Sequence, residues 1–312
     1  MTTSPNPVPE NPPPAHQAHR TLGYFITRVV RHLPDGRRLL FSSRRQRKGL
    51  PPIPLGAGAR RGAGRPSPWL RLWAPHRLAW WIAVLFMIGS ACFAVASFAA
   101  NWPARAPTWL SAPGIINRVF FTGSLFFTSA AWLQLLEAIN GDVAELAGHG
   151  PRHHWRWFAW RPRNLGYLAS LIQFAGTLLF NVNTWDAMLP GLSWRQEDLL
   201  IWTPDIIGSV CFLLASYLAV IEVSHHFWSV KPRQLSWWVV ILNLLGSIAF
   251  MRAALAGFYP PAGSELWAWG ANTYTLAGAL CFLVASYLMI PELFGAGQAA
   301  GDTPGAPEPG AA

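Results

Sequence analysis

The chain has 312 residues, of which 52% are hydrophobic, 12% are charged and 18 are Trp. Its formal net charge at pH 7 is +10, with 14 of its 24 Lys and Arg residues placed before residue 78. This composition excludes an ordinary soluble domain and is typical of an integral membrane protein. Nucleic acid is not an expected partner, because no recognition motif accompanies the basic charge.

Residues 1–77 are basic and rich in Pro, Gly and Arg, so we expect a disordered cytoplasmic tail. Within this tail, the apolar residues of segment 20–33 recur at helical spacing between arginines, which predicts a short amphipathic helix. Such a helix lies on the membrane surface or packs on the protein, and the sequence favours neither. A second disordered tail is expected over residues 293–312.

Six apolar runs follow the basic segment, and each is long enough to cross about 30 Å of hydrocarbon. They cover residues 78–100, 116–138, 165–183, 205–223, 236–258 and 271–291. The predicted fold class is therefore an all-α membrane protein with six transmembrane helices in one domain, 78–292. Lys and Arg are enriched in the loops after the second and fourth runs, which places both termini in the cytoplasm of a bacterial cell. The expected location is the inner membrane.

One short pattern recurs in all six runs: Gly, a small residue, any two residues, then Phe. The glycines are Gly89, Gly123, Gly176, Gly208, Gly246 and Gly278. Their spacing is 34, 32 and 32 residues within successive pairs, which predicts three tandem helical hairpins. Small residues let membrane helices approach closely, so the stripe is expected to form helix-packing surface. The alternative is that part of it lines a pathway.

The repeated Gly-Ser-x-x-Phe cores resemble the YrhK-like domain family of bacterial membrane proteins, which are small two-helix units. The resemblance covers roughly residues 78–292 and is best over 205–292, where segments 208–218 and 278–288 are nearly identical. The third run departs most, with Asn181 and Asn183 at positions where small residues are expected. The resemblance implies a fold class and no particular activity.

Three glutamates, Glu137, Glu222 and Glu292, each follow a repeat glycine by 14 residues. Each lies at the cytoplasmic, C-terminal end of an even-numbered run, where the helix dipole disfavours a carboxylate. They therefore need cationic partners, and the loop residues available at the interface are Arg161, Arg163, Lys231 and Arg233. The alternative is that the glutamates form an ion or proton site.

Arg252 is the basic residue deepest in an apolar run, about 10 Å from the outer boundary at 1.5 Å per residue. It either extends toward the outer interface or meets Asp205, which opens the fourth run from the same side. Both residues are candidate functional polar groups.

No catalytic motif or nucleotide-binding loop lies in the runs, so we expect no enzyme, no cofactor and no metal. The Glu222-x-x-His225 pair lacks the second such motif that a di-iron bundle needs. The sequence therefore favours a non-enzymatic membrane module. The alternative is a small-solute or ion transporter that uses the glutamates. Expected partners are the lipid bilayer and anionic lipids at the cytoplasmic face, and self-association into a homo-oligomer is left open.

Overall fold

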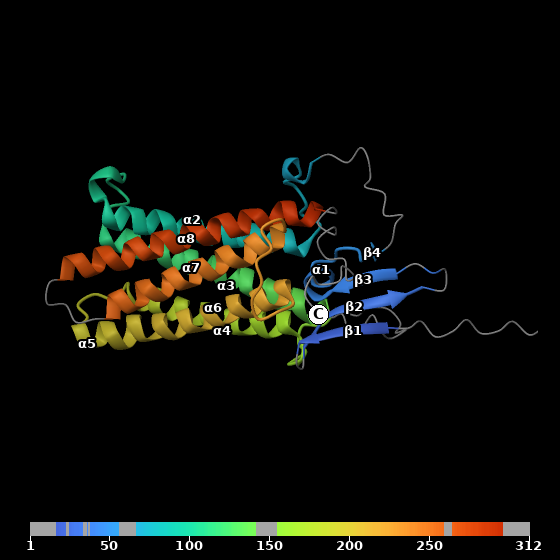
Figure 1. Cartoon of the computed structure of the whole chain (residues 1–312). Helices are drawn as coiled ribbons and strands as arrows, with labels where there is room; N and C mark the ends of the chain where they lie inside the picture. The colour runs from blue at the N-terminus through green and yellow to red at the C-terminus, as the bar shows by residue number, and fades with distance from the viewer. Residues whose placement is uncertain are drawn as a thin grey trace, which may run out of the picture.

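The computed structural model describes residues 17–22, 25–33, 36, 38–55, 67–141, 155–258 and 264–295. A small β-sheet from the N-terminal segment lies at one end of a bundle of long helices (Figure 1). In this part of the chain, six helices are long and apolar enough to cross a membrane. The prediction of a multi-pass helical membrane protein is confirmed at this level.

The six long helices follow the predicted runs closely. They are α2 (Leu78–Asn101), α3 (Pro113–Asn140), α4 (Leu165–Asp186), α6 (Thr203–Ser224), α7 (Leu235–Phe258) and α8 (Ser264–Phe294). The short helix α5 (Trp194–Glu197) and a π-helical turn (Asp198–Trp202) lead directly into α6. Two 3-10 turns, η1 (Pro68–Leu70) and η2 (Pro103–Arg105), flank α2.

Local chemistry explains several helix ends. The Asn164 side chain caps α4 by accepting a hydrogen bond from the Tyr167 backbone N–H. His225 ends α6 in the left-handed conformation, with φ of 56°. The α2 helix ends at Asn101, and the next residue, Trp102, precedes Pro103, which disfavours helical geometry in the residue before it.

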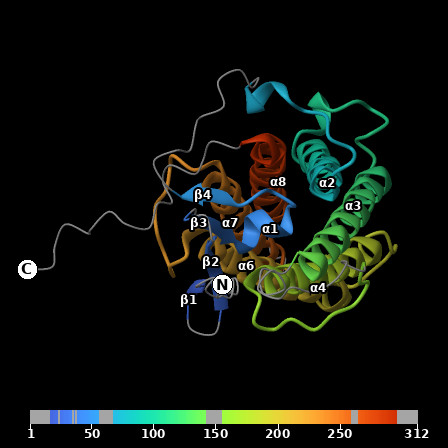
Figure 2. The ribbon, with the colours of Figure 1, turned by 90° about the vertical axis from the view of Figure 1, so that its right-hand side faces the viewer.

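The long helices form a closed ring. Each packs against the next long helix in the chain, and α8 closes the ring by packing against α2 (Figure 2). Large apolar side chains such as Ile88, Leu125, Leu178, Val210 and Leu280 are exposed. Exposed apolar side chains on helices long enough to cross a membrane fit a lipid environment.

The repeat glycines lie where two helices touch. A Cβ added at Gly89 would lie 3.0 Å from the Gly123 carbonyl oxygen, and one added at Gly123 would lie 2.8 Å from the Phe93 ring. The other two pairs repeat this exchange, in which each glycine faces the phenylalanine of the other helix. Gly176 faces Phe212, Gly208 faces Phe180, Gly246 faces Phe282 and Gly278 faces Phe250. The backbones of α2 and α3, of α4 and α6, and of α7 and α8 approach closely at these positions.

The six repeat phenylalanines also meet one another inside the ring. Rings from different helices lie 4.8 to 6.5 Å apart between centroids; the residues are Phe93, Phe127, Phe180, Phe212, Phe250 and Phe282. Aromatic pairs at these separations attract each other beyond the area they bury. This phenylalanine cluster fills the interior of the bundle at the level of the repeat.

The N-terminal segment forms a four-stranded antiparallel sheet in chain order. Its strands are β1 (Gln17–Leu22), β2 (Phe25–His32), β3 (Arg38–Ser42) and β4 (Ile53–Leu55). The predicted amphipathic helix over 20–33 is therefore wrong, because this segment pairs as β1 and β2. The apolar residues of this segment recur at helical spacing, but β2 forms backbone hydrogen bonds with β3, where Val29 pairs with Phe41. This pairing between strands decides the structure of the segment.

The expected disorder of residues 1–77 does not hold where the structure describes them. The short helix α1 (Ser43–Arg47) continues directly from β3, and α1 contacts α3 and α6. Residues 1–16, 56–66 and 296–312, which the prediction also assigned to disordered tails, lie outside the described residues. The helix α8 extends through residue 294, past the predicted start of the C-terminal tail at 293.

Candidate functional site

The helix α1 lies at the end of the bundle where α2, α4 and α7 begin and where α3, α6 and α8 end (Figures 1 and 2). We call this the α1 end. Three cations of this segment, Arg44, Arg47 and Lys48, face the three glutamates of the sequence pattern. We call these six residues the latch cluster.

Within the described residues, Glu292 accepts more hydrogen bonds than Glu137 or Glu222. Arg44 donates from Nε to Oε1 at 2.8 Å and from Nη2 to Oε2 at 3.0 Å, a bidentate arrangement. Lys48 Nζ lies 2.5 Å from Oε2, and Ser236 Oγ donates to Oε1 at 2.7 Å. Because Glu292 is only 4% exposed, these bonds form out of contact with water.

Glu222 and Glu137 share Arg47. The Arg47 Nη2 atom donates to Glu222 Oε2 at 3.1 Å, and Ser43 Oγ donates to Glu222 Oε1 at 2.7 Å. The Arg47 Nε atom lies 3.7 Å from Glu137 Oε2, which is a looser ion pair. Glu222 is 1% exposed and Glu137 is 7% exposed. The carboxylates are thus buried, and not at an exposed interface.

Two glycines make room for Arg47. A Cβ at Gly141 would lie 2.4 Å from the Arg47 Cα atom, and a Cβ at Gly166 would lie 2.2 Å from Arg47 Nη1 and 2.8 Å from Glu222 Oε1. Any larger residue at Gly141 would meet the backbone of α1, which cannot rotate away as a side chain can. The absence of side chains at Gly141 and Gly166 therefore lets Arg47 of α1 pack closely against the bundle.

Burial lowers the pKa of the buried cations Arg44 and Lys48, whereas the charge of Glu292 raises it. Burial lowers the pKa of Arg44, but Glu292 acts in the opposite direction through its charge and its hydrogen bond, so the pKa is raised overall. Burial and the neighbouring Arg44 guanidinium together lower the pKa of Lys48 below its ordinary value, against the attraction of Glu292.

The prediction that loop cations pair with the glutamates is wrong in its choice of partners. Among the described residues, the ion pairs of Glu137, Glu222 and Glu292 are made with cations of α1 and its C-cap. The cations are Arg44, Arg47 and Lys48, and not the expected Arg161, Arg163, Lys231 or Arg233. The sequence did contain a signal for α1. Arg44, Arg47 and Lys48 are spaced i, i+3 and i+4, which puts three cations on one helical face.

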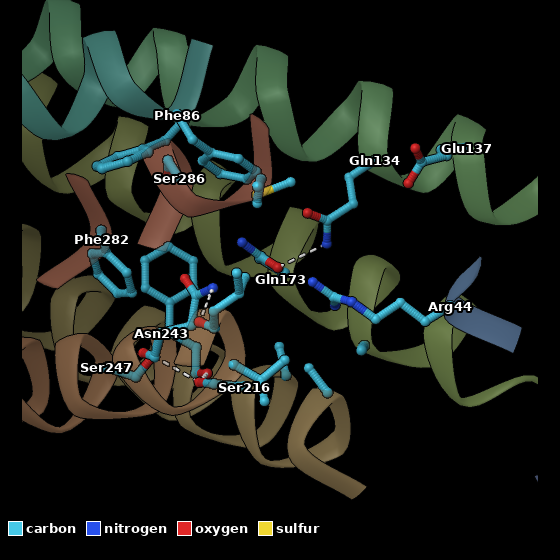
Figure 3. A pocket seen from close by; sticks show the side chains of 18 of the residues that line it. Arg44, Phe86, Gln134, Glu137, Gln173, Ser216, Asn243, Ser247, Phe282 and Ser286 are labelled. Atoms are coloured by element: carbon cyan, nitrogen blue, oxygen red, sulfur yellow. Dashed lines mark hydrogen bonds between the residues drawn. The ribbon is translucent and has the colours of Figure 1, made fainter. Parts of the chain in front are cut away.

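A cavity of about 70 Å³ lies beneath α1, inside the ring. Its lining includes all three latch cations and, at the far side, Phe127, Phe212 and Phe282 of the phenylalanine cluster. Five helices contribute uncharged polar side chains: Gln134, Gln173, Ser216, Asn243, Ser247 and Ser286. In Figure 3 these side chains and Arg44 converge on one space. Side chains of α1 bound the cavity at one end, and phenylalanines bound it at the other.

Of the two alternatives for Arg252, the structure does not show, among the residues it describes, the one in which Arg252 meets Asp205. Arg252 is exposed, and its Cζ atom lies 5.5 Å from the centre of the Tyr274 ring. Asp205 is buried in the first turn of α6, at 8% exposure. Within the described ranges the structure shows no ion pair between them, which favours the alternative that Arg252 extends away from the bundle.

Comparison with models of known protein families, with curated proteins and with solved structures finds no match for this chain. Nothing in these comparisons bears on the resemblance to the YrhK-like family. In the described part of the chain, no group of three or more His, Cys, Asp or Glu side chains has an arrangement that could hold a metal ion.

Proposed function

We propose that the protein is a non-enzymatic module of the bacterial inner membrane whose central cavity receives a small polar solute when α1 leaves the bundle. The observation that carries this proposal is the cavity itself, lined by polar side chains from five helices and covered by the latch cluster. Polar groups inside a membrane bundle are costly and usually serve a function. A purely structural bundle would fill this space with apolar side chains.

The module is built from three tandem hairpins, α2 with α3, α4 with α6, and α7 with α8, with both termini in the cytoplasm. The reciprocal glycine contacts within each pair support the duplication. The tryptophans that open two of the hairpins support it as well. Trp80 and Trp237 each donate to the carbonyl eight residues earlier, and Trp81 and Trp238 each donate to the carbonyl six residues earlier. The proposed relationship of residues 78–292 to the YrhK-like family agrees with this arrangement of two-helix units.

Anionic lipids are the proposed partner at the α1 end. Exposed aromatic side chains precede each hairpin there, including Trp73, Trp157 and Trp228. Arg and Lys residues accompany them in the same segments. Aromatic and cationic side chains at one level of a membrane protein favour the headgroup region of the cytoplasmic leaflet.

Transport across the membrane is the second candidate. The sequence suggested a transporter in which the glutamates bind the solute or ion. In this second candidate the glutamates instead hold α1 in place, because they form ion pairs with Arg44, Arg47 and Lys48. Complete passage requires the phenylalanine cluster to separate as well. Solute binding requires only the release of α1, and it is therefore the function that the geometry supports best.

The test is whether displacing α1 opens the cavity. In a background with Cys92, Cys211 and Cys281 replaced by Ala, a Ser286→Cys reporter is treated with a small membrane-impermeant thiol reagent. Gly141→Ala places a Cβ against the α1 backbone and removes no charge. We expect the reporter to react in the Gly141→Ala protein and to stay unreactive in its parent.

Gly114→Ala is the matched control, because a Cβ at Gly114 meets nothing within 4 Å. A reporter that stays unreactive in the Gly141→Ala protein, while α1 is shown to be displaced, would contradict the proposed opening. Vesicle uptake of small solutes by the same variants tests the second candidate, and uptake without any change in reporter access would favour a different route.

A further inference from the structure

The charges of the latch cluster cancel when α1 is seated. Three cations face three carboxylates, and all six side chains are mostly or fully buried. Of these six residues, four line the cavity beneath: Arg44, Arg47, Lys48 and Glu137. Each of the four is paired within the latch cluster, so a charged solute there would find no unpaired counter-charge among them. Burying an unpaired charge is expensive, whereas burying a neutral polar group is tolerated when it is hydrogen-bonded. The closed cavity therefore disfavours both cations and anions.

The amide side chains that line the cavity have hydrogen-bond donors and acceptors that can pair with a ligand. Gln134 Nε2 donates to Gln173 Oε1 at 3.0 Å and to Ser170 Oγ at 3.4 Å. These bonds occupy the donors of Gln134 and the acceptor of Gln173, so a carbonyl remains on Gln134 and an NH₂ group remains on Gln173. Asn243 donates to the Val239 carbonyl at 3.0 Å, and its own carbonyl oxygen also remains. The wall thus offers both acceptors and a donor.

The volume limits the solute to a small one. A cavity needs at least about 10–15 Å³ to hold one water, so about 70 Å³ admits only a few waters. A solute of about four or five non-hydrogen atoms fits this space. Phe86, Phe282 and Met289 line the apolar side and can contact a methyl or methylene group.

We propose that the closed cavity binds a small uncharged amide, either a primary amide or a urea, whose N–H and C=O groups pair with Gln134, Gln173 and Asn243. This inference rests on the proposed function, because the solute enters when α1 leaves and is enclosed when α1 returns. A solute that fits only the closed cavity must stabilise the seated position of α1.

The experiment compares acetamide, acetate and acetamidinium, which share one planar skeleton and differ in charge. The full-length protein, free of its native cysteines, carries Ser43→Cys in α1 as the reporter of release. We expect acetamide to slow the labelling of this thiol in proportion to its concentration. Acetate and acetamidinium should need concentrations at least about tenfold higher for the same effect.

Gln173→Met removes the free NH₂ group together with the carbonyl that accepts from Gln134, and should weaken the acetamide effect at least about tenfold. Ser129→Ala is the control, because Ser129 is exposed and its hydroxyl donates to the Leu125 carbonyl of its own helix. A Pro190→Cys reporter at the opposite end checks that the solutes do not change the reagent itself.

Equal or stronger protection by either ion would overturn the assignment of an uncharged ligand. Absence of protection by acetamide, in a protein whose cavity opens in the Ser286→Cys experiment, would overturn the ligand class and leave the proposed function standing. An unreactive Ser286→Cys reporter together with absent protection would overturn both.

Discussion

Glu292→Gln is the most direct test of the latch. Glu292 accepts hydrogen bonds from Arg44, Lys48 and Ser236 and is 4% exposed. Removing one partner of a buried ion pair costs about 3–5 kcal/mol, because the remaining charge stays buried. An exposed pair would cost only about 0.2–1 kcal/mol.

These two ranges predict very different rates of α1 release. A change of 1.4 kcal/mol is tenfold in an equilibrium constant, so the buried pair corresponds to a change of at least about 100-fold. The exposed pair corresponds to about fivefold at most. The assay is the labelling rate of Ser43→Cys under conditions where α1 reseats faster than the thiol reacts, so that the rate follows the population of released α1.

Two variants complete the test. Glu197→Gln removes an exposed glutamate at the opposite end and should leave the rate unchanged. Adding Lys48→Met to Glu292→Gln removes one of the two cations left without a partner, and should recover part of the effect. A change of fivefold or less in Glu292→Gln would refute the argument that this carboxylate holds α1.

Three further predictions concern packing, orientation and the outer half of the bundle. Gly278→Ala should lower the free energy of unfolding by about 1–3 kcal/mol, because its Cβ would lie 2.4 Å from a ring carbon of the facing helix. Gly270→Ala on the same helix is the control, because a Cβ there meets no atom within 4 Å. Equal melting temperatures of the two variants in detergent would contradict the close contact. A cysteine at position 190 should react with an impermeant reagent from outside the cell and one at position 150 should not, and the reverse pattern would invert the topology. Arg252→Gln should cost less than about 1 kcal/mol by thermal unfolding, the range of an exposed cation–π contact, and a loss of several kcal/mol would indicate a buried ion pair.

The sequence by itself determined the long helices. Their apolar runs are continuous and local, so the predicted bounds agree with the structure within three residues, except at the start of α8. Membrane helices must satisfy their backbone groups internally, which makes hydropathy alone a sufficient guide to their positions. The repeat also located Gly123 and Gly208, which the structure places at helix contacts.

The tertiary structure decided what those helices enclose. The pattern singled out Glu222 and Glu292 but could not identify their partners, which lie more than 170 residues away in the chain. Arg47 bonds Glu222, and Arg44 and Lys48 bond Glu292. Strands β1 to β4 form through pairing with one another, and the spacing of apolar residues within one strand does not reveal that pairing. The cavity likewise depends on the ring closing through α8 and α2, a contact between the last long helix and the first. Hydropathy is a property of consecutive residues and can be read from the sequence. An ion pair or a cavity forms only when segments that are distant in the sequence come together in the folded protein.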